Sequence, residues 1–426
     1  MKIIVAGTGY VGLVQAAVCS EYGHQVYAYD NNVEKIKSYA SGDAAEIEKH
    51  VNEPGLSNLI KDMLGKYLFF SSDIETIIEG TDVIFLCLPT PPNLDGSTNL
   101  TFYDAAASEL AALLAKRKDK RRVVLVNKST VPIGTARHLE NIMKDHGVEN
   151  VGVASNPEFL ADYGSNTMLL TYFSFWNGVG ARLGEKIDNI RIADLRRGVT
   201  ADDRISTWGS YVSNGAGGSC FGKDIQSLIY QLRRVDVNTK MLESSYEVNE
   251  YQKVYLIDRA ITESDFSFSG KTIAVLGLAF KKQTNDMRDS SSIKVIETLL
   301  GKGVKRIKAY DPLAITEARK EFSPSKNILF EKIEYFHNAQ DAIEETDAVF
   351  ISADWEEFRG LSGTIENTVK PPYLVIDGRR MIPDFQELVN AGYSYIAVGS
   401  PAMLPEEKEA KTSKKSSSSE EKGVTA

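Results

Sequence analysis

The sequence predicts an α/β protein with two doubly wound parallel-sheet domains joined by a central helical region. Short apolar runs alternate with amphipathic stretches from the first residues, which is typical of a parallel sheet covered by helices. This pattern returns in the last third of the chain, and the stretch between is mostly helical in character. We therefore expect sheet domains at residues 1–160 and 263–402, with the helical region at 161–262.

The first domain is expected to begin with a strand at Lys2–Ala6, followed by a helix at Tyr10–Tyr22. The other strands expected here are short apolar runs, at Gln25–Tyr29, Asp82–Leu88, Val123–Asn127 and Val151–Ala154. Helices are expected at Tyr103–Ala115 and Ala136–His146, where apolar residues recur at helical spacing.

The second sheet domain repeats the order of the first. Its expected strands are Lys271–Leu276, Arg306–Tyr310, Asp347–Ser352 and Tyr373–Ile376, with a helix at Ser291–Leu300. In both domains the second strand runs into an aspartate, Asp30 in the first and Asp311 in the second. Residues 403–426 are rich in Glu, Lys and Ser and cannot bury enough apolar surface to fold, so we predict a disordered tail.

Composition narrows the class of protein. The 426 residues are 42% hydrophobic and 25% charged, as in an ordinary globular enzyme, and the net charge of −9 argues against general binding to nucleic acid or a membrane surface. No apolar run reaches the roughly 18 residues that span a bilayer. Three cysteines form no disulfide framework and the first residues do not read as a signal peptide, so we expect a cytoplasmic protein. The five histidines lie outside every motif, which argues against a metal site.

A glycine turn at the start of the chain predicts a dinucleotide site in a Rossmann-like domain. Gly7 permits a tight turn, Gly9 lets the backbone approach a pyrophosphate, and Gly12 allows close packing of helix on strand. Asp30 ends the next strand, where a carboxylate accepts both ribose hydroxyls and repels a 2′-phosphate, so NAD is expected rather than NADP. Lys35 either covers the adenosine side or is a solvated lysine on a helix face.

The stretch Gly217–Asp224 predicts a cysteine nucleophile. Small residues before Cys220 leave room for a substrate at the sulfur, and Lys223 favours the thiolate form. Asp224 is placed to handle a proton or a water molecule. The alternative is that Cys220 is one more buried thiol, as we expect of the other cysteines, Cys19 and Cys87.

These motifs together resemble the UDP-glucose/GDP-mannose dehydrogenase family, and within it the UDP-glucose 6-dehydrogenases. The resemblance covers nearly all of residues 1–400. The matching segments occur in the family's order: Glu53–Leu56, Leu88–Pro91, Ser129–Pro132, Asn156–Leu160, Gly217–Asp224, Gly277–Lys281, then the single residues Thr284, Asp286, Arg288 and Ser290, and finally Asp354–Phe358 and Asp377–Arg379.

The resemblance implies an NAD-dependent four-electron oxidation of UDP-glucose to UDP-glucuronate, in which Cys220 carries a thiohemiacetal and then a thioester. It also implies a homodimer without nucleic-acid or membrane partners. The residues it implies as catalytic are Cys220, Asp224, Thr130, Glu158 and Asn166. Those implied at the cofactor are Gly7, Gly9, Tyr10, Val11, Gly12, Asp30, Lys35, Thr90, Thr130, Glu158, Lys223 and Arg288. Those implied at the substrate are Glu158, Asn166, Gly217, Lys281 and Arg379. For each basic residue a surface ion pair is the alternative role.

The chain departs from the family pattern between Glu158 and Cys220, where it is several dozen residues shorter. Asp162 stands where the family has a catalytic lysine, and Asn166 follows at the asparagine position. The alternative is that Asp162 is what remains of the family's second acid. Gly222 replaces a usual proline, and Ala216 replaces an aromatic residue. We expect the missing segment to leave an edge of the first sheet either unpaired or paired with another part of the chain, and to lower activity. The alternatives are an impaired or inactive nucleotide-sugar-binding homologue, or a dehydrogenase for GDP-mannose or a UDP-N-acetyl sugar.

Overall fold

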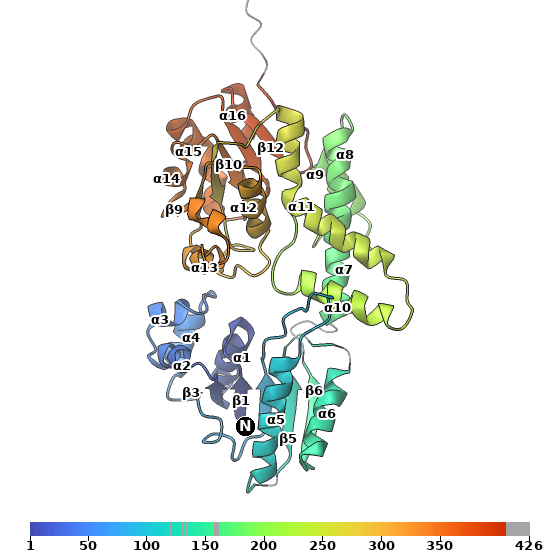
Figure 1. Cartoon of the computed structure of the whole chain (residues 1–426), viewed down its shortest axis with the longest axis vertical. Coiled ribbons are helices and arrows are strands. Elements are labelled where there is room, and N and C mark those ends of the chain that lie inside the picture. Colours follow the sequence, from blue (N-terminus) through green and yellow to red (C-terminus); the bar gives the residue numbers. More distant parts are fainter. Residues whose placement is uncertain (120, 130, 133, 157–161, 406–426) are drawn as a thin grey trace, which may run out of the picture.

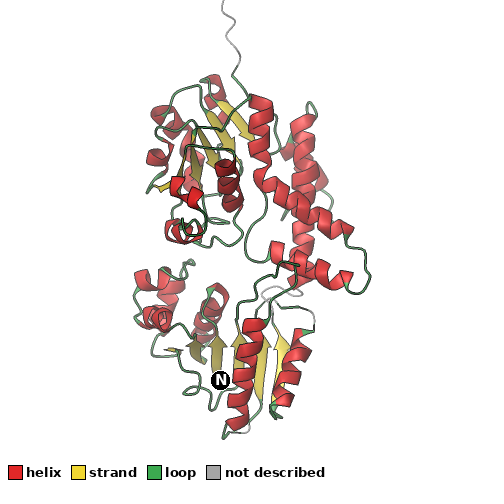
Figure 2. Cartoon of the chain, viewed as in Figure 1, coloured by secondary structure: helices red, strands yellow, loops and turns green. Residues whose placement is uncertain are grey.

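The computed structural model describes residues 1–119, 121–129, 131–132, 134–156 and 162–405. Figure 1 shows a sheet domain at each end of the long axis, with a group of helices along one side that joins them. Figure 2 shows strands in both end domains and helices along the side that joins them. These joining helices come from the middle of the sequence. The predicted architecture of two doubly wound parallel-sheet domains is confirmed.

The first sheet is parallel and six-stranded, in the order β3-β2-β1-β4-β5-β6. Its strands are β1 (Lys2–Ala6), β2 (Gln25–Tyr29), β3 (Leu68–Ser71), β4 (Val83–Leu86), β5 (Val123–Asn127) and β6 (Val151–Ser155). Successive strands are added outward from β1, first on one side (β2, β3) and then on the other (β4, β5, β6), so the order of strands reverses between β1 and β4. There Ile3 pairs with Val26 on one side and with Val83 on the other, and all of these strands are parallel. A doubly wound sheet binds its ligand at such a switch point, beyond the carboxyl ends of the strands.

Helices cover both faces of this sheet: α1 (Tyr10–Glu21), α2 (Val33–Ala40), α3 (Ala44–Glu48), α4 (Leu56–Met63), α5 (Thr101–Lys116) and α6 (Thr135–Asp145). Strand β1 shows why, since its side chains alternate between two buried cores. Ile3 and Val5 pack with Leu13 of α1, whereas Ile4 packs on the opposite side with Tyr103 of α5. A strand that buries both faces reads as a continuous apolar run, which made it visible in the sequence.

The second sheet repeats this topology, in the order β12-β11-β10-β7-β8-β9. Its strands are β7 (Thr272–Leu276), β8 (Arg306–Tyr310), β9 (Ile333–Tyr335), β10 (Ala348–Ile351), β11 (Leu374–Asp377) and β12 (Ser394–Ala397). Its helices are α12 (Ser291–Gly301), α13 (Ile315–Glu321), α14 (Ala339–Ile343), α15 (Leu361–Thr368) and α16 (Phe385–Asn390), with 3-10 turns η2 (Ile328–Lys332) and η3 (Glu356–Gly360). Both six-stranded sheets therefore place their switch point beside their own first strand.

The central region is helical, as predicted. It comprises α7 (Asp162–Phe175), the π-helical turn η1 (Trp176–Gly180), α8 (Ala181–Lys186), α9 (Ile192–Val199), α10 (Phe221–Arg233) and α11 (Lys240–Ser264). Helix α7 packs against α10 and α11. Among the described residues, no helix has both the length and the apolar composition that crossing a membrane requires.

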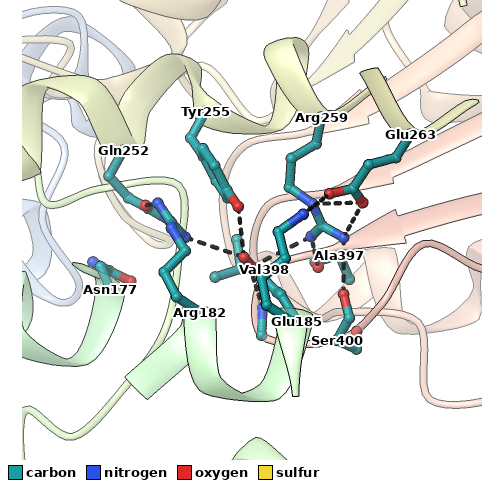
Figure 3. A network of polar contacts seen from close by, with 12 residues as sticks. Asn177, Arg182, Glu185, Gln252, Tyr255, Arg259, Glu263, Ala397, Val398 and Ser400 are labelled. Atoms are coloured by element: carbon teal, nitrogen blue, oxygen red, sulfur yellow. Dashed lines mark hydrogen bonds and ion pairs between the residues drawn. The ribbon is translucent and has the colours of Figure 1, made fainter. Parts of the chain in front are cut away.

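A buried polar network fastens the central helices to the second sheet domain (Figure 3). Glu185 of α8 has a fully buried side chain, and its carboxylate accepts hydrogen bonds from the Tyr255 hydroxyl at 2.7 Å and from the Gly399 backbone N–H at 2.8 Å. Arg259 of α11 donates to the carbonyl of Ala397 at 2.8 Å and to that of Ser400 at 3.0 Å. Because leaving either buried charge without a partner would be costly, these hydrogen bonds of Glu185 and Arg259 hold α8 and α11 against β12 and the residues that follow it.

The sequence missed the three outer strands β3, β9 and β12. The first two are short and only partly buried, so their apolar signal is weak. At the other edge of the first sheet, β6 pairs only with β5 among the described residues. The backbone of Met403 bonds to that of Tyr395, and the rest of the predicted tail lies outside the described residues from 406 onwards.

Candidate active site

The glycine turn between β1 and α1 has the geometry of a pyrophosphate site. Gly7 has φ +95°, and a Cβ there would lie 2.2 Å from the Cys87 carbonyl oxygen. A Cβ on Gly12 would lie 1.8 Å from the Gly7 carbonyl oxygen, so the third glycine is needed for packing. A Cβ on Gly9 would meet nothing within 4 Å. The described chain therefore leaves open space at the one position where a dinucleotide phosphate must approach the backbone.

Asp30 follows β2 and binds the glycine turn through Thr8. Its Oδ2 accepts from the Thr8 backbone N–H at 3.0 Å, the Thr8 hydroxyl at 2.8 Å and Lys35 Nζ at 2.9 Å. Burial by itself would raise the pKa of Asp30, but the hydrogen bonds from Lys35, Thr8 and Asn32 lower it below its usual value. The carboxylate is therefore charged at neutral pH. The Lys35 side chain is 20% exposed and paired with Asp30, so it is not a solvated lysine.

Cys220 occupies the N-cap of α10, between a glycine loop and the first turn of that helix. The loop reaches it through Gly218, whose φ of +100° disfavours any residue with a side chain, and where a Cβ would lie 3.1 Å from the Phe280 ring. The Ser219 hydroxyl lies 3.7 Å from the Cys220 sulfur. The positive end of the α10 dipole favours a thiolate at this position, so the predicted nucleophile is placed where its reactive form is stabilised.

Asn166 and Asp224 meet beside this helix end. Asn166 Nδ2, from α7, donates to Asp224 Oδ2 at 2.7 Å, although the two residues are 58 positions apart. Both side chains are buried, with Asp224 0% exposed. Lys223 Nζ lies 3.6 Å from the other carboxylate oxygen of Asp224 and 3.4 Å from the hydroxyl of Thr90, which follows β4. The structure thus brings predicted residues from the first domain and two central helices to one place.

The second sheet domain also reaches the glycine turn. The Tyr10 hydroxyl donates to Asn285 Oδ1 at 2.8 Å, and the Arg288 guanidinium lies 5.0 Å from the centre of the Tyr10 ring. Burial lowers the pKa of Arg288, but hydrogen bonds and charge from Asp286 raise it above its usual value, and Tyr10 and Cys220 act in the same direction. Arg288 is therefore a fixed cation between the nucleotide turn and the nucleophile.

The loop before Cys220 lies against the carboxyl ends of the second sheet. The Asn214 backbone N–H donates to the Gly378 carbonyl at 2.9 Å, and Asn214 Nδ2 donates to the Ser352 hydroxyl at 2.9 Å. Arg379 donates to the Ser352 carbonyl at 2.8 Å, which places this predicted substrate residue next to the loop. Lys281 is exposed, with Nζ 5.4 Å from the centre of the Phe280 ring.

Two predicted catalytic residues, Thr130 and Glu158, lie outside the described residues. Sequence reasoning missed three polar residues of α11, namely Asn249, Gln252 and Lys253, which hold the loop before the nucleophile. Asn249 accepts from the Ala216 N–H at 2.8 Å and donates to the Ala216 carbonyl at 3.0 Å. Their spacing of three and four residues puts them on one helix face. Polar residues at helical spacing, in line with apolar positions of α11, are the signal in the sequence that would have indicated them.

Comparison with protein families matches all three parts of the chain. The NAD-binding domain of the UDP-glucose/GDP-mannose dehydrogenase family matches residues 1–169, its central domain residues 160–251, and its UDP-binding domain residues 274–384. The UDP-glucose 6-dehydrogenase TuaD of Bacillus subtilis is 33% identical over 94% of both chains. A UDP-glucose 6-dehydrogenase of Rhizobium meliloti is 30% identical over 94% of this chain and 100% of its own.

Solved structures agree with this fold. The UDP-glucose dehydrogenase of Pyrobaculum islandicum superposes with a TM-score of 0.81 at 26% identity, covering 94% of this chain and 98% of its own. The fold is shared as well by a UDP-D-ManNAc dehydrogenase of Pyrococcus horikoshii, with a TM-score of 0.74 at 22% identity over 94% and 99% of the two chains. The alignment with TuaD runs over 456 positions, more than the 426 residues of this chain, so that relative has residues without a counterpart here.

Proposed function

Because this chain belongs to the UDP-glucose/GDP-mannose dehydrogenase family and carries its NAD-binding domain, we propose that it oxidises UDP-glucose to UDP-glucuronate. Relatives at 33% and 30% identity are named as UDP-glucose 6-dehydrogenases, which favours this substrate over other nucleotide sugars. The observation that carries the proposal is the placement of Cys220 at the N-terminus of α10, beside the buried Asn166–Asp224 hydrogen bond of 2.7 Å.

The chemistry assigned to Cys220 explains why a thiol is required. The C6 alcohol of the sugar is first oxidised to an aldehyde by loss of its hydroxyl proton and of a hydride from C6. The Cys220 thiolate then adds to the aldehyde carbon, a C–S bond forms, and the oxygen takes a proton to give a thiohemiacetal. Loss of the carbon-bound hydrogen as hydride and of the hydroxyl proton leaves a thioester. Water then attacks the thioester carbon, the C–S bond breaks, and the carboxylate leaves as the thiolate returns. When bound, NAD supplies the hydride acceptor for both oxidations.

We assign Asp224 to the water of the last step. Its carboxylate is held by Asn166 and lies next to the Lys223 ammonium, so its position is fixed before substrate arrives. A carboxylate oriented by a neutral donor accepts a proton from water as the tetrahedral intermediate forms. Thr130 and Glu158 are proposed to assist from outside the described residues, because they match the family's motifs.

The cofactor is assigned to the turn Gly7–Gly12, with Tyr10 and Val11 in its first helical residues and Asp30 and Lys35 on the ribose. Lys223, Thr90 and Arg288 are assigned to the nicotinamide side, where they lie near the nucleophile. The substrate is assigned to the second sheet domain. Gly217 is assigned to the sugar because it matches the family's nucleophile motif, while Lys281 and Arg379 supply charge for the diphosphate and hydroxyl groups.

We further propose a homodimer formed through α7 and the turn after it. Met168, Phe175 and Val179 are 70%, 47% and 46% exposed and recur along one face of this segment. Exposed apolar side chains at helical spacing indicate a surface that a partner covers. Sedimentation of the purified protein tests this, because Phe175→Glu should yield monomers whereas the native chain sediments as a dimer.

A second candidate is a nucleotide-sugar-binding protein with little turnover, favoured by Asp162 at the position where the family has a catalytic lysine. One pair of measurements separates the two. NADH formation with UDP-glucose, at two NADH per UDP-glucuronate, supports the dehydrogenase. Tight UDP-glucose binding without NADH formation supports the second candidate. NADH formed only with GDP-mannose or a UDP-N-acetyl sugar would reassign the substrate.

A further inference from the structure

A buried lysine lies behind the nucleophile loop. Lys253 of α11 is 2% exposed, and its Nζ lies 2.7 Å from Asp289 Oδ1 and 2.7 Å from Glu250 Oε1. Burial alone would lower the pKa of Lys253, but the charges of Asp289 and Glu250 raise it above its usual value. The ammonium is therefore charged and held between two carboxylates. Lys294 and Tyr246 are the other titratable groups that act on this cluster.

Asp289 touches the chain on both sides of Cys220. A Cβ on Gly217 would lie 2.4 Å from the Asp289 carbonyl oxygen, and a Cβ on Gly222 would lie 3.0 Å from its Oδ2. Asp289 itself has φ +51°, a left-handed conformation that aspartate tolerates better than most residues. The Asp289 backbone therefore packs against the loop at Gly217, and the Asp289 carboxylate lies next to Gly222 in the first turn of α10.

Lys253 also touches the loop directly. A Cβ on Gly215, whose φ is +88°, would lie 2.9 Å from the Lys253 Cγ. Glycine-rich backbone has high conformational freedom, so a loop with glycines at 215, 217 and 218 holds a thiol in place only where its surroundings restrain it. The aliphatic part of Lys253 packs next to Gly215, and the Lys253 ammonium binds Asp289, whose backbone packs against Gly217. Together these contacts restrain the loop.

We propose that Lys253 and Asp289 are positioning residues for Cys220. Their ion pair holds the glycine loop, and the ammonium neutralises a carboxylate that would otherwise oppose the positive end of α10 and disfavour the thiolate. That this ion pair contributes to sugar oxidation rests on the proposed function. Its effect on the reactivity of the Cys220 thiol does not, and can be measured without any substrate.

The test is the alkylation rate of Cys220 by iodoacetamide at neutral pH, followed by mass spectrometry of its peptide. Lys253→Met should slow alkylation about tenfold, the effect of raising the thiol pKa by one unit. Lys253→Arg should react as the native protein does, since it keeps the charge. Lys271→Met is the matched control, because it removes a lysine from a partly exposed pair with Asp347 at 2.9 Å and should change nothing.

A second variant guards against misfolding. Lys253→Met with Asp289→Asn removes both charges of the ion pair, and the charge that remains, on Glu250, is on a side chain that is 29% exposed to water. Asparagine keeps the left-handed backbone, so this double variant should fold. It should alkylate at the native rate but show a lowered kcat, with unchanged affinity for NAD. Native alkylation in Lys253→Met, or native kcat in the double variant, overturns the inference. If the native protein forms no NADH, the proposed function fails while the alkylation series still decides the positioning role.

Discussion

Alanine at Gly9 and at Gly12 should separate cofactor binding from folding. The two glycines stand three residues apart in one turn, yet the structure gives them different surroundings. A Cβ on Gly9 meets nothing within 4 Å, whereas a Cβ on Gly12 would lie 1.8 Å from the Gly7 carbonyl oxygen and 2.9 Å from its carbonyl carbon. The same change therefore fills open space in one case and forces the backbone apart in the other.

The magnitudes follow from these distances. Gly9 has φ −76° and ψ −167°, an extended backbone that alanine adopts freely, so Gly9→Ala should change the free energy of unfolding by less than about 1 kcal/mol. Gly12→Ala must move backbone by more than an ångström to reach ordinary contact, and overpacking of this kind costs about 1–3 kcal/mol or more. If a pyrophosphate approaches Gly9, its alanine variant should lose about tenfold or more in NAD affinity, or ~1.4 kcal/mol.

Thermal unfolding without NAD and an NAD titration measure the two effects separately. We expect Gly9→Ala to unfold at the native temperature and bind NAD weakly, and Gly12→Ala to unfold earlier. Native NAD affinity in Gly9→Ala would show that the dinucleotide does not approach this turn. Equal destabilisation of both variants would refute the reasoning from the Cβ contacts.

The remaining predictions concern the cofactor, the nucleophile, its neighbours and the shortened segment. Asp30→Ser should bind NADP more tightly and NAD less tightly, because the carboxylate repels a 2′-phosphate; equal affinity of the native protein for both cofactors contradicts this. Cys220→Ala should abolish UDP-glucuronate formation, and undiminished product in that variant excludes the covalent role. Asn166→Ala should lower the free energy of unfolding by about 1.5–3 kcal/mol, because it removes a hydrogen bond to a buried charge. A double-mutant cycle with Asp224→Asn should give a coupling energy above ~0.5 kcal/mol, and simple additivity would mean that the bond contributes nothing. Turnover should fall about 10²–10³ below that of a full-length relative, and Asp162→Lys alone should restore little; kinetics comparable to the relative would show that another cation acts in its place.

The inner strands and the nucleotide turn were predictable because their signals are local. Strand β1 buries both faces, so its last four residues, Ile3 to Ala6, form an uninterrupted apolar run. The spacing of Gly7, Gly9 and Gly12 reflects contacts within one turn. The outer strand β9 has three residues with a single buried position, which leaves too little signal for detection. Edge strands of this kind are stabilised by their one neighbour rather than by their own composition.

The sequence by itself determined the doubly wound architecture, the glycine turn with its acid, and, through resemblance to a family, the identity of the nucleophile motif. Only the tertiary structure decided which residues meet. Asn166 and Asp224 are 58 positions apart, and nothing local in either segment encodes the 2.7 Å bond between them. The same holds for Lys253, which reads as a surface lysine on a long helix until Asp289 is brought to it. Such contacts depend on how α7, α10 and α11 pack together, and packing is set by the combined shapes of all the buried side chains rather than by any one segment.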